Sequence, residues 1–104
     1  MLKVGIVGAA GYAGAELVRI VLRHPEFDLC VITSNSDEGA TLASVYPAFS
    51  GVTNLVFSRH DNPELFNCDV VFLATPHTVA MKSAPGLLAS GVTVVDLSAD
   101  YRLR

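Results

Sequence analysis

The stretch LKVGIVGAAGYAG, residues 2–14, decides the fold class of this 104-residue chain. Its first half is a short apolar run that ends at Gly8, which is typical of a strand buried in a parallel sheet. Helical periodicity follows over residues 12–23, and Pro25 ends that helix. The next apolar run, residues 29–33, predicts a second strand and completes a strand–turn–helix–strand unit.

Beyond this unit, the chain alternates between polar turns and apolar runs. The pattern predicts a helical turn at 40–45, a short strand at 54–57, a helix start at Pro63 capped by Asp61 or Asn62, strands at 70–74 and 92–97, and a helix at 79–90 interrupted at Pro85 and ended by Gly91. We therefore expect one domain, residues 1–104, with an α/β fold of the Rossmann-like type: three layers, doubly wound, with a mainly parallel sheet.

The composition excludes several classes of protein. With 51% hydrophobic and 16% charged residues, the chain is expected to fold rather than to remain disordered. A net charge of −3 and few aromatic residues argue against binding of nucleic acid. No targeting or membrane-spanning segment is predicted, and the balance of charges suits a cytoplasmic protein. Cys30 and Cys68 lack the spacing of metal ligands and are interpreted as reduced structural thiols, so no metal site is expected.

The glycines after the first strand predict a phosphate-binding turn. Gly8, Gly11 and Gly14 follow a GxxGxxG spacing, with Ala10 where the commoner GxGxxG pattern has its second glycine. Backbone N–H groups at the start of the helix would face the pyrophosphate of a dinucleotide. The nucleotide-binding residues expected in this turn are Gly8, Ala10, Gly11, Tyr12, Ala13 and Gly14. The alternative is a glycine-rich turn that only lets strand and helix pack together.

The end of the second strand bears on which dinucleotide is bound. Folds selective for NAD often place Asp or Glu there, whereas this strand ends in Thr33, Ser34 and Asn35. The small hydroxyl and amide groups of Ser34 and Asn35 could form hydrogen bonds with a 2′-phosphate without repelling it, which favours NADP. The other interpretation is that both are plain turn residues.

Two later strand ends carry further polar residues, since ligands of open parallel sheets bind beyond the carboxyl ends of the strands. Thr75, Pro76 and His77 follow the strand at 70–74, where a nicotinamide would lie. His77 is a candidate general acid or base, or else a residue that caps a helix or lines the cofactor.

The strand at 92–97 leads into a denser polar cluster. Arg102 is suited to an anionic substrate, Ser98 adds a hydroxyl donor, and Asp100 could hold Arg102. A solvated loop with an Asp–Arg pair explains the same composition equally well.

Several segments together resemble N-acetyl-gamma-glutamyl-phosphate reductases. They are GAAGYAGAEL at 8–17, VVFLATPH at 70–77 and DLSADYRL at 96–103, supported by His24-Pro25 and Tyr46-Pro47. The glycine turn is shared with aspartate-semialdehyde dehydrogenases, whereas the string LSADYR is more specific to the reductases. The resemblance covers nearly the whole chain.

The resemblance implies a cytoplasmic, homo-oligomeric enzyme of arginine biosynthesis, which reduces an acyl phosphate to a semialdehyde with NADPH. In that family a cysteine thiolate attacks the acyl phosphate, the thioester takes hydride, and a histidine assists proton transfer. By carry-over, the turn at 8–14, Ser34 and Asn35, and residues 75–77 would hold NADP, and Arg102 with Ser98 would hold the substrate.

The nucleophile motif of the family is absent from this sequence, and neither cysteine matches it. We therefore expect no catalytic residue in this chain, which would be the cofactor-binding N-terminal part of the reductase and inactive alone. In the family a C-terminal segment completes the sheet, so the fold is expected to be incomplete and its stability marginal. The alternatives are the NADP-binding domain of an aspartate-semialdehyde dehydrogenase and a stand-alone, non-catalytic nucleotide-binding module.

Overall fold

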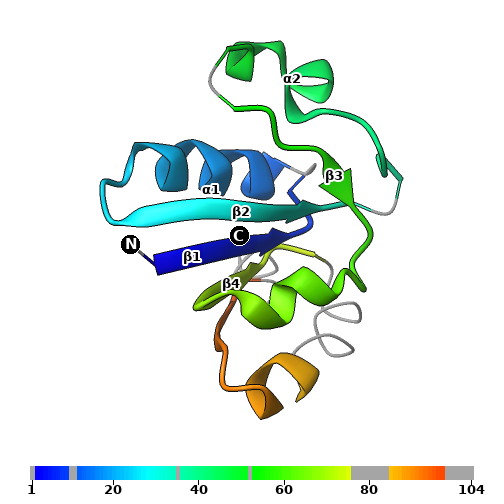
Figure 1. Ribbon diagram of the computed structural model, residues 1–104. Coiled ribbons are helices and arrows are strands. Elements are labelled where there is room, and N and C mark those ends of the chain that lie inside the picture. The colour runs from blue at the N-terminus through cyan, green and yellow to red at the C-terminus, as the bar shows by residue number, and fades with distance from the viewer. Residues whose placement is uncertain (1, 10–11, 35, 52, 76–84, 98–104) are drawn as a thin grey trace.

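A parallel sheet of five strands forms the centre of the computed structural model, which describes residues 2–9, 12–34, 36–51, 53–75 and 85–97 (Figure 1). The strands are β1 (Leu2–Val7), β2 (Phe27–Thr33), β3 (Phe57–Ser58), β4 (Val70–Leu73) and β5 (Thr93–Asp96). Their spatial order is β3-β2-β1-β4-β5, and every neighbouring pair is parallel. This order, with β1 in the centre, confirms the predicted Rossmann-like sheet.

Helix α1 (Tyr12–Arg23) covers one face of the sheet (Figure 1). Its bounds agree with those predicted from the sequence. Val18 and Val21 on its apolar side pack against Val4 and Ile6 of β1 and Ile32 of β2, and none of the five is more than 1% exposed. Burial of these aliphatic side chains is the main contribution that this face makes to stability.

The opposite face is covered by shorter elements. These are the 3-10 helix η2 (Pro63–Asn67) and the helical residues 85–89. Leu65 of η2 and Leu87 pack against Val7, Val71 and Leu73 of the sheet. Side chains therefore bury both faces of the central strands, which explains their continuous apolar sequences.

The start of β2 differs from the prediction. The strand begins at Phe27, two residues before the predicted start, because Lys3 pairs in register with the polar Asp28 at the exposed end of the sheet. The register between β1 and β2 then shifts by one residue at Cys30. This β-bulge places both Cys30 and Val31 on the η2 face of the sheet.

The strand expected at 54–57 is wrong in its bounds. Only Phe57 continues into β3, whereas Val56 forms an antiparallel bridge with Thr41. The apolar run is thus divided between two partners, which its composition does not reveal. Thr41 also caps α2 (Leu42–Val45), where its hydroxyl accepts the Ser44 N–H.

Other predicted boundaries agree with the structure. Asn62 caps η2 through a hydrogen bond from the Glu64 N–H, although the element is a 3-10 helix. Gly91, at φ +85°, follows the helical residues 85–89. Residues 79–84 of the helix predicted at 79–90 lie outside the described residues. A second 3-10 helix, η1 (Pro47–Phe49), follows α2.

Candidate nucleotide-binding edge

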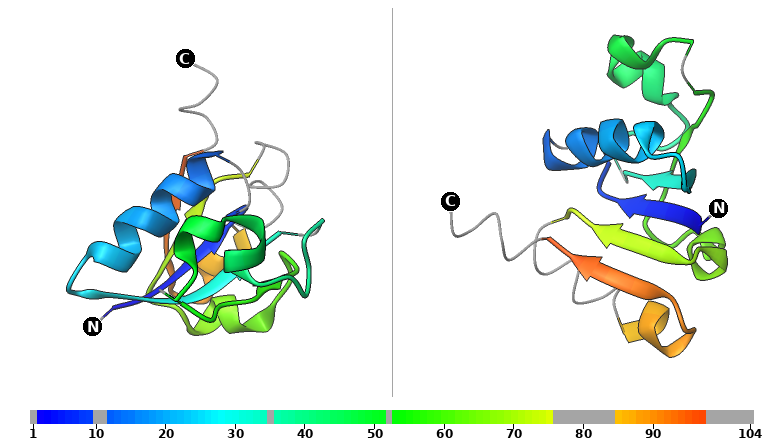
Figure 2. Two further views of the ribbon diagram at one scale, coloured as in Figure 1. Left: turned by 90° about the horizontal axis from the view of Figure 1, so that it is seen from above. Right: turned by 90° about the vertical axis from the view of Figure 1, so that its left-hand side faces the viewer.

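All strands of the sheet run in one direction, so their carboxyl ends meet along one edge, here called the carboxyl edge. Figure 2 shows the arrowheads of β1, β4 and β5 pointing the same way. The residues that follow these strands include Gly8 after β1, Ser34 after β2, Arg59 after β3 and Thr75 just beyond β4. Open parallel sheets bind their ligands at this edge.

Gly8 makes the turn from β1 possible in two ways. Its φ of +88° lies in the region that side chains disfavour. A Cβ atom there would also lie 2.6 Å from Thr75 Cγ2 and 3.1 Å from the carbonyl of Ala74. The turn therefore lies directly against the residues that follow β4, and only glycine fits between them.

Gly14 lets α1 approach the same turn. A Cβ atom at Gly14 would collide with the Gly8 carbonyl oxygen and would lie 2.6 Å from Ala9 Cα. The helix therefore starts in contact with the turn backbone, with its first N–H groups close to the carboxyl edge. An arrangement of this kind is suited to an anion at the helix N-terminus.

Thr33, at the end of β2, fixes the turn from the other side. Its carbonyl oxygen accepts hydrogen bonds from the Gly8 N–H at 3.1 Å and the Ala9 N–H at 3.0 Å. Its hydroxyl oxygen also lies 3.2 Å from the Gly8 nitrogen. Thr33 is fully buried, so this polar anchor is shielded from water.

Thr75 contributes a buried hydroxyl at the carboxyl edge. The residue is 5% exposed, and its Oγ1 atom has no hydrogen-bond partner among the described residues. A buried hydroxyl without a partner is costly, and in native proteins it often marks a place where a ligand or water supplies the bond. Thr75 was expected from the sequence to line the cofactor, and its position beside Gly8 suits that role.

The loop after β2 places a carboxylate at the end of this strand, which the sequence alone does not predict. The Ser34 hydroxyl donates to a carboxylate oxygen of Asp37 at 3.0 Å, and the Ser36 hydroxyl lies 3.3 Å from the same oxygen. The loop thus turns back and brings a carboxylate to the end of β2, where the linear sequence shows none. Ser34 is buried and is also tied to β3, since its N–H donates to the Ser58 carbonyl at 2.8 Å.

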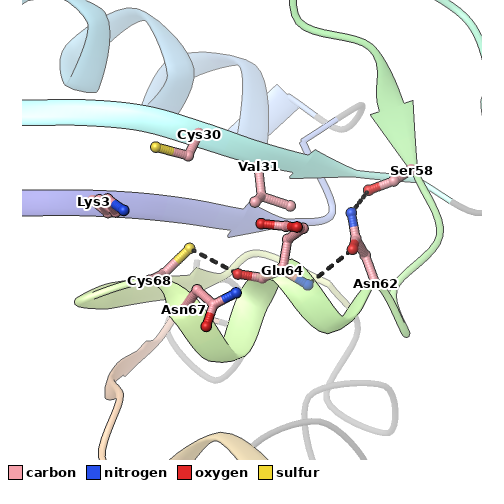
Figure 3. Close-up of a pocket in the computed structure, with 8 residues that line it drawn as sticks. All are labelled: Lys3, Cys30, Val31, Ser58, Asn62, Glu64, Asn67 and Cys68. Carbon is pink, nitrogen blue, oxygen red and sulfur yellow. Dashed lines mark hydrogen bonds between the residues drawn. The ribbon is translucent and has the colours of Figure 1, made fainter.

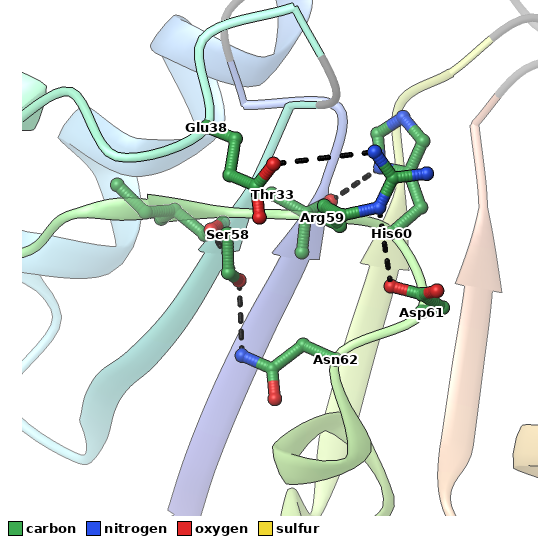
Figure 4. A network of polar contacts seen from close by, with 8 residues as sticks. Thr33, Glu38, Ser58, Arg59, His60, Asp61 and Asn62 are labelled. Atoms are coloured by element: carbon green, nitrogen blue, oxygen red, sulfur yellow. Dashed lines mark hydrogen bonds and ion pairs between the residues drawn. The ribbon is translucent and has the colours of Figure 1, made fainter.

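A polar cluster at the end of β3 was missed by sequence reasoning (Figure 4). The Arg59 guanidinium lies 4.0 Å from a carboxylate oxygen of Glu38 and 3.7 Å from one of Asp61. His60 Nδ1 lies 2.7 Å from the Thr33 hydroxyl. Burial, reinforced by the charge of Arg59 and partly offset by Asp61, lowers the pKa of His60. The ring is therefore neutral at pH 7.

The missed residues left only a weak signal in the sequence. Arg59 and His60 follow a strand of two residues, and it is the pairing of β3 with β2 that brings them to the carboxyl edge. The His60 ring reaches the turn that begins at Gly8, here called the nucleotide turn, through the Thr33 hydroxyl.

A cavity of about 230 Å³ lies under β1 and β2 on the η2 side and extends to Ser58 at the end of β3 (Figure 3). It is lined by Lys3, Cys30, Val31, Ser58, Asn62, Glu64, Asn67 and Cys68. Burial raises the pKa of the Cys68 thiol to about 11, and burial together with Asp28 raises the pKa of Cys30. Both thiols are thus protonated at neutral pH and poorly suited to act as nucleophiles, in keeping with their interpretation as structural residues.

Seven of the residues predicted for the site lie outside the described part of the chain. They are Ala10, Gly11, Asn35, Pro76, His77, Ser98 and Arg102. Tyr12 and Ala13 both lie in the first turn of α1.

Within the described residues, no group of three or more His, Cys, Asp or Glu side chains is placed to hold a metal ion. The described helices are all too short or too polar to cross a membrane.

Comparison with known families agrees with this geometry. The family model for the semialdehyde dehydrogenase, NAD binding domain, matches residues 3–104. The chain belongs to this family. It is therefore an NAD(P)-binding domain, as the glycine turn and the sheet order indicate.

The chain also resembles curated relatives along its whole length. It is 53% identical over 104 residues to the N-acetyl-gamma-glutamyl-phosphate reductase of Herminiimonas arsenicoxydans and 55% identical to that of Marinobacter nauticus. Each match covers all of this chain, which spans only 30% of the length of each relative. The resemblance inferred from LSADYR and the glycine turn is thus confirmed.

Solved structures support the fold. The domain superposes on aspartate semialdehyde dehydrogenase from Candida albicans, a structure with NADP, with a TM-score of 0.81 at 23% identity over 98% of this chain and 31% of that one. It superposes on aspartate semialdehyde dehydrogenase II from Vibrio cholerae with a TM-score of 0.78 at 20% identity, covering 99% of this chain and 30% of that one. At such low identities, the likeness establishes the fold alone.

Proposed function

We propose that this domain binds NADP(H) as the cofactor-binding part of an N-acetyl-gamma-glutamyl-phosphate reductase. The observation that carries the proposal is the glycine turn, held between Thr33 and Thr75 at the carboxyl edge. Identity above 50% to two such reductases over the whole chain supports the choice of enzyme. The substrate would be an acyl phosphate that is reduced to a semialdehyde.

The turn and the start of α1 would hold the pyrophosphate. Gly8 and Gly14 leave room for a close approach of the backbone, and the first N–H groups of α1 point toward the edge. The buried hydroxyl of Thr75, which lacks a partner among the described residues, would supply a hydrogen bond to the dinucleotide. When bound, the nicotinamide supplies the hydride, and the domain positions and shields it.

The preference for NADP rests on the cluster at the ends of β2 and β3. Ser34 and Asn35 were expected to accept the 2′-phosphate, and Arg59 adds a cation that the sequence around them lacks. Asp37 opposes this preference, although the hydroxyl hydrogens of Ser34 and Ser36 are directed at its carboxylate. The Arg59 ion pairs are long and exposed, so the guanidinium is easily recruited by a phosphate.

The remaining predictions belong to the whole enzyme. Ser98 and Arg102 are proposed to bind the acyl phosphate, and Pro76 and His77 to line the nicotinamide. We assign neither Cys30 nor Cys68 as the nucleophile. The enzyme is proposed to be a cytoplasmic homo-oligomer, with no role in binding nucleic acid or membranes.

The test uses the complete polypeptide that carries this chain. Titration followed by nicotinamide fluorescence should give an affinity for NADPH at least about tenfold higher than for NADH, a difference of ~1.4 kcal/mol. N-acetyl-glutamyl phosphate should be reduced at the expense of NADPH. Preference for NADH would reject the assignment of Ser34, Asn35 and Arg59 to a 2′-phosphate.

Two further outcomes address the alternative functions. Faster reduction of aspartyl phosphate would favour an aspartate-semialdehyde dehydrogenase. Dinucleotide binding without reduction of either acyl phosphate would favour a non-catalytic nucleotide-binding module.

A further inference from the structure

His60 reaches the nucleotide turn through a chain of two hydrogen bonds. Its Nδ1 atom lies 2.7 Å from Thr33 Oγ1, and Thr33 Oγ1 lies 3.2 Å from the Gly8 nitrogen. Figure 4 shows the first of these bonds, between His60 and Thr33. Together the two bonds connect the residues that follow β3 with the end of β2 and with Gly8 after β1. No role for His60 follows from the glycine turn itself, because the histidine lies 52 positions further along the sequence.

The directions of these bonds follow from the groups involved. The Gly8 N–H can only donate, so the hydroxyl oxygen of Thr33 is the acceptor in this bond. Thr33 is fully buried, and its own hydroxyl hydrogen needs an acceptor. Nδ1 of His60 is the acceptor at hydrogen-bond distance, and it accepts only when the ring is neutral with its hydrogen on Nε2.

We propose that His60 is a positioning residue for the nucleotide turn: its neutral ring accepts the Thr33 hydroxyl hydrogen, Thr33 receives the Gly8 N–H, and protonation of His60 weakens dinucleotide binding. A protonated ring donates at Nδ1, so the Thr33 hydroxyl hydrogen loses its acceptor inside the fold. The Gly8 N–H, which also donates to the Thr33 carbonyl oxygen at 3.1 Å, then shares the hydroxyl oxygen with a charged donor, and the hydroxyl group must rotate its hydrogen away from His60. The inference rests on the proposed function, because it concerns the geometry of the turn that would bind the dinucleotide.

The charged groups around His60 determine the pH range. Arg59 and Asp61 flank the ring along the chain, and Glu38, from the loop after β2, pairs with Arg59 at 4.0 Å. Burial and Arg59 oppose the charged form more than Asp61 favours it, so the pKa lies below its usual value of about 6.5. The contribution of His60 to dinucleotide affinity is therefore complete above about pH 6.5, and it is lost as the pH falls through the lowered pKa.

The experiment compares wild type with His60→Asn and His60→Ala in the complete polypeptide. The Oδ1 atom of asparagine lies near the place of Nδ1 and accepts a hydrogen bond at any pH. NADPH affinity is measured from about pH 5 to about pH 8. Relative to His60→Asn, wild type should lose about fivefold or more in affinity at the acidic end, whereas His60→Ala should be weaker throughout by about the same factor.

Two further variants separate this role from a general effect. His24→Asn is the matched control, since His24 stacks on Phe27 and its Nδ1 accepts the Glu26 N–H, on the side of the sheet where β2 begins. It should follow the wild-type pH profile. Thr33→Val should reproduce the loss in His60→Ala, and the double variant should show no further loss, because both remove the same chain of bonds.

Titration of the ligand itself affects all variants equally and cancels in the comparison. A pH profile of His60→Asn identical to that of wild type overturns the inference, as does wild-type affinity in His60→Ala. If His60→Ala does not fold, as judged by circular dichroism, the profile of His60→Asn alone decides. Absence of dinucleotide binding by wild type at every pH overturns the proposed function as well, which distinguishes the two failures.

Discussion

Two parts of the carboxyl edge are built in different ways. The nucleotide turn at Gly8 is held mainly by backbone: the Thr33 carbonyl accepts two N–H groups, and the carbonyl of Gly8 lies against Gly14, while the Thr33 hydroxyl adds one side-chain contact. The cluster at the end of β3 is held by side chains, through Arg59 with Glu38 and Asp61. The turn is packed against neighbouring backbone, whereas the arginine pairs are long and more than half exposed.

The difference separates two tasks that a nucleotide site performs. A backbone-built turn gives the same geometry for any dinucleotide, because every such ligand has a pyrophosphate. Exposed side-chain pairs exchange partners at little cost and so are suited to discriminating between ligands. Substitutions in the turn should therefore affect folding and all dinucleotides, whereas substitutions at Arg59 should affect selectivity.

The largest effect is expected for Gly8→Ala. The methyl group would meet Thr75 Cγ2 at 2.6 Å, and the residue would keep a φ of +88°. We expect a loss of about 2–4 kcal/mol in the free energy of unfolding, the sum of backbone strain and overpacking. Affinities for NADPH and NADH should both fall by more than about tenfold. Urea unfolding and fluorescence titration measure the two effects.

Gly39→Ala is the matched control for this prediction. Gly39 has the same φ of +88°, but an added Cβ atom would meet nothing within 4 Å. The Gly39→Ala variant should therefore lose only about 1–2 kcal/mol in the free energy of unfolding, from backbone strain, and should retain its dinucleotide affinity. Equal losses in the two variants would show that the contact with Thr75 is unimportant.

Thr75→Val should separate stability from binding. Valine has the shape of threonine but removes the buried hydroxyl that lacks a partner among the described residues. We expect the free energy of unfolding to rise by about 1 kcal/mol, while affinity for either dinucleotide falls by about tenfold, the value of one buried hydrogen bond. Thermal unfolding and titration report on the two quantities.

Thr75→Ser keeps the hydroxyl and loses the methyl group that contacts Gly8. It should retain affinity and lose some stability, the reverse of the valine variant. Unchanged affinity in Thr75→Val would remove this hydroxyl from the proposed site.

The same contrast explains what the sequence could predict. The turn was predicted because its requirements are local: glycines at fixed spacing between an apolar strand and an amphipathic helix leave few other structures. The bounds of α1 and the parallel order of the sheet follow from equally local patterns. At Gly8 and Gly14 the structure shows why glycine is required, a tight turn and a close approach of the helix, while their role in nucleotide binding stays a prediction.

The cluster at β3 was missed because its residues meet only through tertiary pairing. β3 has two residues, and its apolar run is divided between a bridge to Thr41 and pairing with β2. Asp37 likewise returns to Ser34 through a loop whose path no periodic pattern encodes. Contacts that depend on such pairings leave no repeating signal in the sequence.

The smallest effect is expected for Arg59→Ala, which tests whether the side-chain cluster selects the cofactor. Loss of the guanidinium should reduce NADPH affinity by about three- to fivefold and leave NADH affinity unchanged, because only NADPH carries the 2′-phosphate. The free energy of unfolding should change by less than about 0.5 kcal/mol, since both ion pairs of Arg59 are exposed. Titrations with both dinucleotides at low and moderate salt measure the effect, which should shrink as salt screens the charge.

Arg19→Ala removes the same charge from another exposed ion pair, with Glu16 on α1 at 2.8 Å, and serves as the control. If it weakens NADPH binding as much as Arg59→Ala does, the effect reflects net charge rather than a contact with phosphate. Glu38→Gln provides the opposite perturbation, because it releases Arg59 from one carboxylate and should tighten NADPH binding. Opposite effects of these two substitutions on NADPH, with none on NADH, would place selectivity in the side chains at β3 and leave the backbone turn to bind what all dinucleotides share.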